Sequence, residues 1–288
     1  MSDIVDQLVI RPMTRDELDT LVEWAAQEGW NPDIDDAQVF WDTDPEGFIA
    51  AELEGQLIGG GSIVSYNGDY GFMGFFIIHP DYRGQGLGNR LWHERKKRLQ
   101  ERLNEDASIG MDGVFDMQAY YAKGGFVFAE RDLRFEGIAE THEIAPNIVP
   151  VDQVDFQALN RYDQRHFPTE RRQFLKDWIQ RPNGHAFACV VEGSIKGYAV
   201  MRPCREGYKI GPLFADGATI ADQVFKALSN QVPGEKIYLD IHQDNPYALA
   251  LVHMHKMKEV FGCARMYLGP RPQLPIEQIY GITTFELG

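Results

Sequence analysis

The chain has 288 residues, of which 44% are hydrophobic, and it carries a net charge of -15 at neutral pH. Its length suits two domains of about 140 residues each, and the lack of an apolar run of ~18 residues argues against a membrane-spanning helix. The first residues, MSDIVDQLVIRP, lack the basic and apolar regions of a secretory signal. Three cysteines without CxxC spacing argue against a disulfide or zinc framework, so we expect a cytoplasmic protein without a metal site.

The negative charge is concentrated in the first half. Residues 1–145 carry 28 acids and 12 bases, whereas residues 146–288 carry 15 acids and 16 bases. No Lys or Arg occurs between Arg15 and Arg83, where the acids include Glu23, Glu28, Asp33, Asp35, Asp36, Asp42, Asp44 and Glu46. These acids form either a solvated surface or a rim that concentrates a cationic substrate. Nucleic acid is not expected as a partner, because phosphate binding uses clustered Lys and Arg.

The first half alternates helix and strand patterns. Thr14 and Glu17 have the spacing of a capping box, and the helix that they open ends at Gly29. Further along we expect a short helix over 34–41, strands over 47–53, 56–66 and 70–78, a helix over 87–103, a strand over 107–114, a helix over 116–123 and a strand pair over 126–138.

The second half repeats this order. We expect helices over 154–167, 171–180, 218–231 and 245–257, and strands over 185–191, 195–202, 208–214, 236–242, 263–268 and 280–287. The similar length and order of the two halves predict a duplicated fold. The proline-containing stretch EIAPNIVP places the boundary between a domain of residues 1–145 and a domain of residues 146–288.

A glycine-rich turn connects the aromatic run over 70–78 to the helix that begins at Leu87. It reads HPDYRGQGLG from His79 to Gly88. Glycines let backbone N–H groups converge on a phosphate beside the positive end of a helix. The turn has no GK[ST], which excludes a Walker A lysine, and no GxGxxG in a parallel strand–helix–strand unit.

Two motifs together indicate a family. The pattern Arg83-x-x-Gly86-x-Gly88 is followed by AYYAKGGF, Ala119 to Phe126, and in these motifs the sequence resembles the GNAT superfamily of acyl-CoA-dependent N-acetyltransferases. The tandem layout is similar to a subgroup with a second, degenerate GNAT-like domain. The resemblance implies an α/β (α+β) fold of two tandem domains, each a mixed, mostly antiparallel twisted sheet flanked by helices.

The resemblance also implies a binding site for acetyl-CoA. The diphosphate would lie on the amides of Arg83, Gly84, Gln85, Gly86, Leu87 and Gly88, and the pantetheine arm along Phe76, Ile77 and Ile78. An amide near Ile77 or Ile78 would polarise the thioester carbonyl. Tyr121 would protonate the departing thiolate, or Tyr120 if the register is shifted by one residue. No metal and no covalent enzyme intermediate are implied.

The acceptor side is less well defined by the sequence. The acceptor loop of the family corresponds to EGWNP, so Glu28, Trp30, Asn31 and Asp33 are the expected substrate-binding residues. An amine must be neutral to attack, which requires a base. Asp112 is the candidate, with Asp33 and Glu28 as rivals, because the glutamate of some relatives on the preceding strand is absent.

The predicted activity is transfer of an acetyl group from acetyl-CoA to a primary amine, expected to be a cationic small molecule, by direct attack in a ternary complex. The alternatives are a non-catalytic acyl-CoA sensor and an acetyltransferase of protein N-termini or lysines. The sequence leaves the oligomeric state open.

The second half lacks the glycine turn. Its counterpart, IGPLFADGAT, has one glycine after Phe214, so coenzyme A binding is doubtful there. We expect this half to wall the acceptor site, with Asp240 and His242 facing the cleft and a second active centre as the alternative. The basic run Arg95 to Arg98 is interpreted as a solvated helix face, or as a contact to the 3′-phosphate of coenzyme A.

Overall fold

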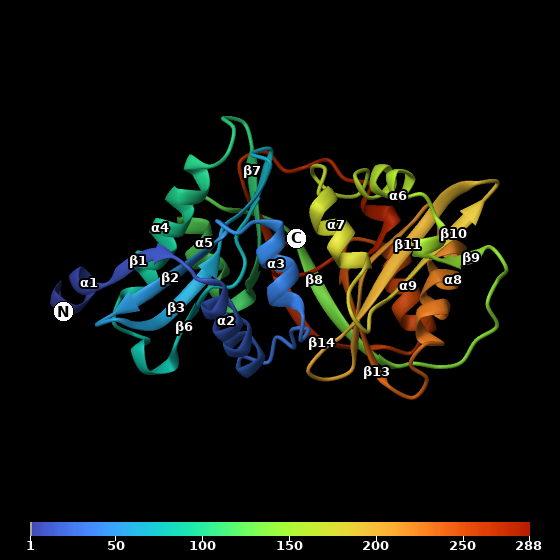
Figure 1. The fold of residues 1–288 in the computed structure, drawn as a ribbon, viewed down its shortest axis with the longest axis horizontal. Helices are drawn as coiled ribbons and strands as arrows, with labels where there is room; N and C mark the ends of the chain where they lie inside the picture. Colours follow the sequence, from blue (N-terminus) through green and yellow to red (C-terminus); the bar gives the residue numbers. More distant parts are fainter. Residues whose placement is uncertain (1) are drawn as a thin grey trace.

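Two β-sheets form the centre of the molecule. The computed structural model describes residues 2–288, with side chains from residue 4 onward, and its two halves lie side by side along the long axis (Figure 1). The first sheet has the antiparallel order β1 (Val9–Pro12), β2 (Phe48–Leu53), β3 (Gln56–Ser62) and β6 (Ile77–Ile78). The second has the order β4 (Val64–Tyr66), β5 (Tyr70–Phe72), β7 (Ser108–Val114), β14 (Lys258–Leu268), β8 (Val127–Ile138), β13 (Lys236–His242), β12 (Tyr208–Ala215), β11 (Ser194–Pro203), β10 (His185–Val191) and β9 (Ile148–Pro150), and β15 (Ile279–Gly281) pairs with β12.

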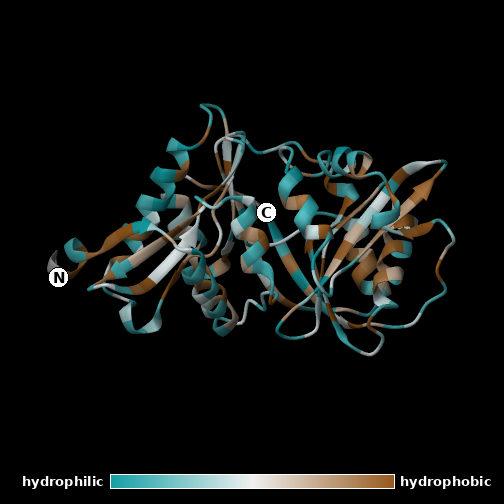
Figure 2. Cartoon of the chain, in the orientation of Figure 1, coloured by the Kyte–Doolittle hydropathy of each residue, from teal (hydrophilic) through white to brown (hydrophobic). Residues whose placement is uncertain are grey.

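Helices cover these sheets. They are α1 (Ser2–Gln7), α2 (Arg15–Gln27), α3 (Asp36–Thr43), α4 (Leu87–Glu101), α5 (Gln118–Lys123), α6 (Phe156–Asp163), α7 (Arg172–Ile179), α8 (Ala218–Ser229) and α9 (Pro246–Met254). The strands are mostly brown to white in Figure 2, whereas α4 and α7 show teal on the side that faces the viewer. A Cβ at Gly60 would point to Leu21 of α2, and one at Gly61 to Arg95 of α4. Neighbouring residues of a strand face opposite ways, so α2 and α4 cover opposite faces of the first sheet.

The helix expected after Thr14 is confirmed, together with its cap. The Glu17 N–H donates to Thr14 Oγ1 at 3.3 Å, and the Thr14 N–H donates to Glu17 Oε2 at 2.8 Å. Both orphan donors at the start of α2 are thereby satisfied. The buried face of α2 consists of Leu18, Leu21, Val22 and Ala25.

The two halves of the chain exchange their last long strands. β14, from the second half, lies between β7 and β8, which both belong to the first half. β8 in turn pairs with β13 of the second half, from Asp132 opposite His242 to Ile138 opposite Lys236. The expected boundary at 145/146 therefore divides the sequence but not the second sheet. Because strand pairing is a long-range contact, nothing in the local pattern of β8 or β14 reveals this exchange.

The strand expected over 70–78 is divided in two, which corrects the sequence analysis. Residues 73–76 leave the β conformation, and Phe75 has a φ of +40°. The Gly74 N–H donates to Ser62 Oγ at 2.8 Å, and a Cβ on Gly74 would collide with the carbonyl oxygen of Glu286. The strand expected over 56–66 is divided as well, into β3 and β4, so each hairpin arm contributes to both sheets.

Three further differences concern the ends of the halves. The strand pair expected over 126–138 is a single strand, β8, because its partners are β13 and β14. Of the strand expected over 280–287, only β15 forms, and residues 282–287 continue as buried irregular chain. The sequence analysis also missed α1, β1 and β9.

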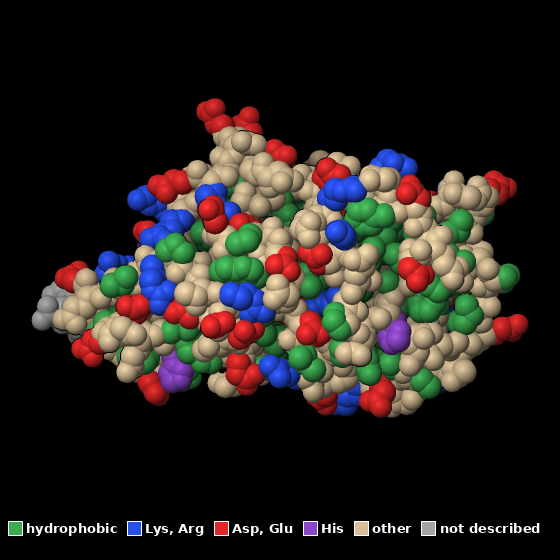
Figure 3. All heavy atoms as spheres, viewed as in Figure 1, with side chains coloured by type: hydrophobic (Ala, Val, Ile, Leu, Met, Phe, Trp, Pro, Cys, Tyr) green, Lys and Arg blue, Asp and Glu red, His purple; other side chains and the backbone are tan. Residues whose placement is uncertain are grey.

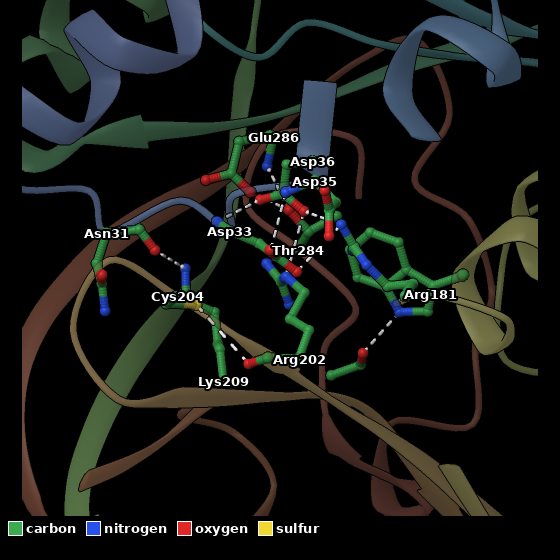
Figure 4. A network of polar contacts seen from close by, with 12 residues as sticks. Asn31, Asp33, Asp35, Asp36, Arg181, Arg202, Cys204, Lys209, Thr284 and Glu286 are labelled. Carbon is green, nitrogen blue, oxygen red and sulfur yellow. Dashed lines mark hydrogen bonds and ion pairs between the residues drawn. The ribbon is translucent and has the colours of Figure 1, made fainter. Parts of the chain in front are cut away.

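The halves share one apolar core and one ionic cluster. Phe40 of α3 stacks on Trp178 of α7 at a ring distance of 6.3 Å, within a cluster of buried residues drawn from both halves. Beside it, Asp36 lies 2.9 Å from Arg181 and 3.3 Å from Arg202, and the side chains of all three are fully buried (Figure 4). In the part of the chain described here, none of the helices is long and apolar enough to cross a bilayer.

Candidate active site

A cavity opens where the first and second sheets diverge. β5 runs parallel to β7 from Tyr70 opposite Ser108 to Phe72 opposite Gly110. The Met73 N–H makes one more bond, to the Gly110 carbonyl at 2.9 Å, after which the chain turns away to pair as β6 with β3. The cavity between these diverging strands has a volume of about 540 Å³.

Both halves of the chain line this cavity. Its walls are Glu28, Trp30, Met73, Gly74, Phe75, Phe76, Ile77, Ile78, Tyr82, Arg83, Gly84, Gly88, Trp92, Arg95, Met111, Asp112, Val114, Met117, Tyr121, Arg134, Phe261, Cys263, Phe285 and Glu286. The last four come from the second half. The second half, which we expected to wall the acceptor site, thus contributes to the cavity, because the strand exchange brings β14, with Phe261 and Cys263, beside β7.

The glycine turn forms a row of free amides at the mouth of the cavity. Gly84 and Gly86 have φ angles of +76° and +84°, and a Cβ on Gly84 would meet no heavy atom within 4 Å. Among residues 4–288, whose side chains are described, the backbone N–H groups of residues 84–88 find no hydrogen-bond acceptor. α4 begins at Leu87, so its positive end points at the same place. This arrangement suits an anion such as a diphosphate.

Arg83 fixes the turn against the end of β6. Its Nε donates to the Ile78 carbonyl at 2.8 Å, and its Nη2 pairs with the carboxylate of Glu28. Glu28, which the sequence analysis placed in the acceptor loop, thus lines the mouth of the cavity as the partner of Arg83. Of the expected contact residues for coenzyme A, Phe76, Ile77, Ile78, Arg83, Gly84 and Gly88 line the cavity, while Gln85, Gly86 and Leu87 lie in the turn outside it.

Tyr121 lies inside the cavity, whereas Tyr120 lies outside. Tyr121 is 5% exposed and packs on Trp92 at a ring distance of 5.0 Å. Burial raises the pKa of Tyr121 to about 12, so its hydroxyl keeps its proton at neutral pH. The Tyr120 hydroxyl instead donates to Asn89 Oδ1 at 2.8 Å on an exposed surface. The position of Tyr121 suits a proton donor.

Asp112 lines the cavity within a buried ion pair. Its two carboxylate oxygens accept from Arg265 at 2.6 and 2.7 Å. Burial raises the pKa of Asp112 to about 8, and the neighbouring Asp132 acts in the same direction, although Arg265 opposes both. We expected His242 and Asp240 to face the cleft, but neither lines the cavity. His242 pairs with Asp132 at 2.5 Å, and Asp240 pairs with Arg134.

The expected acceptor loop, EGWNP and Asp33, lies partly at the cavity and partly at the interface between the two halves. Trp30 lines the cavity. The Asn31 side chain donates to the Glu206 carbonyl at 2.9 Å, and Asp33 is fully buried at 3.1 Å from Arg181 (Figure 4). Neither side chain reaches the cavity. The structure therefore gives Asn31 and Asp33 a role in joining the halves, and Asp33 does not serve as a base rival to Asp112.

The acids of the first half are largely paired. Five of the eight acids that suggested an acidic rim lie within ion-pair distance of arginine: Glu23 with Arg205, Glu28 with Arg83, Asp33 and Asp36 with Arg181, and Asp44 with Arg102. Acidic and basic side chains lie close together on the face seen in Figure 3. These five acids are thus neutralised locally, three of them by arginines of the second half, although the net charge of the chain remains -15. They give little support to a cation-attracting rim.

Arg95 is the cavity residue that the sequence analysis placed wrongly. It is fully buried rather than solvated, and its Nη2 donates to the carbonyls of Ser62, at 2.7 Å, and Gly74. Burial lowers the pKa of Arg95 to about 9. A signal was present, because Arg95 follows Leu91 and Trp92 at the i+4 and i+3 spacing of the buried stripe of α4. Arg134, Phe261, Cys263, Phe285 and Glu286 were missed without such a signal, since long-range pairing brings them there.

The corresponding place in the second half is filled by the chain itself. β12 runs parallel to β13 over residues 208–210 and then diverges, as β5 does from β7. β15 enters this gap, with Gly281 opposite Leu213 and the Ile282 N–H bonded to the Asp240 carbonyl at 2.8 Å. Before α8, the carboxylate of Asp216 accepts from the Tyr162 hydroxyl at 2.9 Å. A filled gap and an acidic helix start leave no place for a diphosphate.

Sequence comparison matches both halves to one family. Residues 15–126 match the Acetyltransferase (GNAT) family, and residues 159–281 match an Acetyltransferase (GNAT) domain. The chain belongs to the GNAT acetyltransferase family. As a tandem GNAT protein it is an acyl-transferring enzyme, and its mixed sheets flanked by helices are the fold that the motifs predicted. No group of three or more His, Cys, Asp or Glu side chains in residues 4–288 is arranged to hold a metal ion.

Relatives of this tandem GNAT protein cover its whole length. It is 29% identical over 283 residues to holothin acyltransferase of Pseudoalteromonas sp. (strain SANK 73390), covering 96% of this chain and 94% of that protein. Its fold is similar to that of a Pyrococcus horikoshii protein, with a TM-score of 0.83 at 22% identity over 98% of this chain and 96% of that one. A tandem GNAT protein from the clavulanic acid biosynthesis pathway has a TM-score of 0.63 at 12% identity, over 92% and 99%.

Proposed function

We propose that this enzyme transfers an acetyl group from acetyl-CoA to a primary amine of a small molecule. The observation that carries the proposal is the open cavity between β6 and β7, with the free amides of residues 84–88 at its mouth and Tyr121 inside. In the described residues, the edge of β6 that faces away from β3 has no strand partner. The pantetheine arm of acetyl-CoA would pair with this edge much as an added strand does.

The reaction then proceeds by direct attack. The amine nitrogen forms a bond to the thioester carbonyl carbon, and the bond from that carbon to sulfur breaks. A backbone amide near Ile77 or Ile78 would donate to the developing oxyanion, a contact typically worth about 3 to 4 kcal/mol. The nitrogen of an ammonium acceptor loses two protons: the sulfur receives one through the Tyr121 hydroxyl, and the other leaves through a base.

Asp112 is the proposed base. Its raised pKa of about 8 means that its carboxyl loses its proton near the pH at which many amines become partly neutral. Arg265 holds both of its oxygens, so the second half of the chain positions this group. Asp112 and Tyr121 line the same cavity, as acid–base groups in a common site must.

The acceptor is tested by a screen. Wild-type enzyme with acetyl-CoA is incubated with amines, amino sugars, peptides and holothin, which is included because of the named relative. Free thiol release is followed over time, and products are identified by mass spectrometry. We expect release above hydrolysis for at least one small amine. Acetyl-CoA binding without any acceptor-dependent release would favour the sensor, and release with peptides alone would favour a protein acetyltransferase.

Tyr121 and Tyr120 form a matched pair for the chemical step. We expect Tyr121→Phe to lower kcat by about 100- to 10,000-fold, the range of one general acid, while the affinity for acetyl-CoA changes little. Tyr120→Phe, which removes a hydroxyl outside the cavity, should leave kcat within about twofold of wild type. Equal kcat values for both variants would exclude Tyr121 as the acid.

A further inference from the structure

The cavity contains three carboxylates, and they differ in their partners. Glu28 pairs with Arg83 at the mouth, and Asp112 pairs with Arg265 at the β7 wall. Glu286 is only 3% exposed, yet no Lys, Arg or His in residues 4–288 lies within ion-pair distance of it. A buried carboxylate without a paired charge is costly, so an occupant of the cavity is the natural partner.

The position of Glu286 is fixed by its own segment. Thr284 Oγ1 donates to Glu286 Oε2, and the Glu286 N–H donates to Thr284 Oγ1 at 3.1 Å. The backbone of Glu286 packs directly against Gly74, at the break between β5 and β6. Glu286 therefore lies beside the strand break that creates the cavity, and in the described residues the Thr284 hydroxyl is the one hydrogen-bond donor to its carboxylate.

Three cations lie near Glu286, but in the described residues none of them is within ion-pair distance of its carboxylate. Arg134 of β8 makes two bonds to Asp240, at 2.7 and 2.8 Å. Arg202 of β11 lies 3.3 Å from Asp36 without making a hydrogen bond, and Lys209 of β12 donates to the Asn31 carbonyl at 3.0 Å (Figure 4). These charges act on Glu286 without satisfying its oxygens. Arg134 and Arg202 are offset by these aspartates, whereas Lys209 donates only to backbone carbonyls in the described residues, so its charge opposes further positive charge near this end of the cavity.

The wall on this side is aromatic. Phe261, Phe285 and Trp30 line it, and the Arg134 guanidinium lies over the Phe285 ring at 5.0 Å and over the Phe261 ring at 5.6 Å. The opposite end, with Trp92, Phe76 and Tyr121, faces the glycine turn. The cavity thus has a donor end near α4 and an aromatic end that carries Glu286.

We propose that Glu286 binds the acceptor, taking a hydrogen bond from the amine N–H and directing the nitrogen lone pair toward the thioester. The acceptor is a primary amine on an aromatic or apolar body with no further positive charge, because Lys209, whose charge no carboxylate offsets in the described residues, lies at this end. This inference rests on the proposed function, and it replaces the cationic acceptor that the sequence analysis expected. Residues 282–287, which end the second half, therefore complete the active site of the first.

The test compares three probe amines: holothin, phenethylamine and spermidine, each with saturating acetyl-CoA. We expect phenethylamine or holothin to have the higher kcat/KM and spermidine the lowest. For the better substrate, Glu286→Gln should lower kcat/KM by about 30- to 100-fold through KM, because the lost contact is charge-assisted. The KM for acetyl-CoA should stay within about twofold, as the donor end is untouched. Glu277→Gln, an exposed change in the same segment, is the matched control.

The outcomes separate this inference from the proposed function. A wild-type enzyme that binds acetyl-CoA but acetylates no amine would overturn the proposed function and this inference with it. Turnover with Glu286→Gln unaffected, or a preference for spermidine, would overturn this inference alone. If Glu286→Gln fails to fold, judged by lost acetyl-CoA affinity, Glu286→Asp keeps the charge on a shorter side chain. It should then give an intermediate loss in kcat/KM, and wild-type values would again overturn the inference.

Discussion

The two halves use the same strand divergence in opposite ways. In the first half, β6 leaves β7 and the gap remains open as a cavity of about 540 Å³. In the second half, β12 leaves β13 and β15 fills the gap. Diverging strands expose backbone groups that need partners. A ligand can supply them in the first half, and the chain supplies them in the second.

The starts of the two helices that follow the gaps also differ: the start of α4 suits an anion, and the start of α8 does not. In the described residues, the turn before α4 and the first two residues of α4 together carry five free amides, whereas α8 begins after Asp216, whose carboxylate is bonded to Tyr162 and lies near Lys196. The Tyr121 carbonyl accepts from the Phe126 N–H, and the Val252 carbonyl accepts from the Met257 N–H, so the second half has the buried Val252 in place of Tyr121. The gap in the first half has the features of an active site, and the gap in the second half is closed by the pairing of β12 with β15. The segment after β15 then continues to Glu286 in the open gap.

The largest loss of stability is expected from breaking the buried ionic cluster between the two halves. Asp36→Ala leaves the buried Arg181 and Arg202 without their shared carboxylate, which should lower the free energy of unfolding by about 3 to 5 kcal/mol. Asp42→Ala, an exposed change on the same helix, should cost less than about 0.5 kcal/mol. Denaturant unfolding measures both. Similar values for the two variants would mean that the cluster does not hold the halves together.

The same cluster gives a pH dependence. Burial favours the neutral form of Asp36, but Arg202 and Arg181 hold its pKa below the ordinary value of 3.8. A carboxyl whose pKa is lower in the folded chain contributes stability above its unfolded pKa and loses it as the pH falls further. The difference in unfolding free energy between wild type and Asp36→Ala should therefore shrink below a pH of about 3.8.

An intermediate loss of stability is expected from adding a side chain in β15, which fills the gap of the second half. A Cβ at Gly281 would meet Leu239 Cδ1 at 2.6 Å and Leu213 Cβ at 3.1 Å, so Gly281→Ala should cost about 1 to 3 kcal/mol of stability. Acetyl-CoA binding should be unchanged. The matched control is Gly88→Ala in α4, where the nearest atom to the new Cβ lies at 3.5 Å and stability should be equal or slightly higher. Loss of acetyl-CoA affinity in Gly281→Ala would contradict the division of roles.

The smallest effect is expected when the acidic residue before α8 is copied to the matching position before α4. Gln85 lies two residues before α4, as Asp216 does before α8. Gln85→Asp places a negative charge beside the diphosphate and should weaken acetyl-CoA binding about tenfold, or about 1.4 kcal/mol, by calorimetry at low salt. Gln85→Asn keeps the size without the charge and should bind as wild type does. Equal affinity of both variants would place the diphosphate elsewhere.

The sequence by itself determined the features that depend on neighbours along the chain. The capping box of α2, the positive-φ glycines before α4 and the tyrosine of α5 were all predicted, because caps, turns and helix periodicity are local. The buried stripe of α4 could also have placed Arg95 correctly. The glycine turn and the tyrosine motif carry the resemblance to the GNAT family, and that resemblance implied the fold class, which is confirmed.

Only the tertiary structure decided which residues of the second half contribute to the site in the first half. The exchange of β8 and β14, the pairing of Asp112 with Arg265 and the arrival of Glu286 at Gly74 join residues more than 100 positions apart. Such contacts depend on register and on burial against distant partners, and a local pattern fits several of these arrangements equally well. The same reason explains why Asp33, an apparent acceptor-loop acid, is a buried joint between the halves.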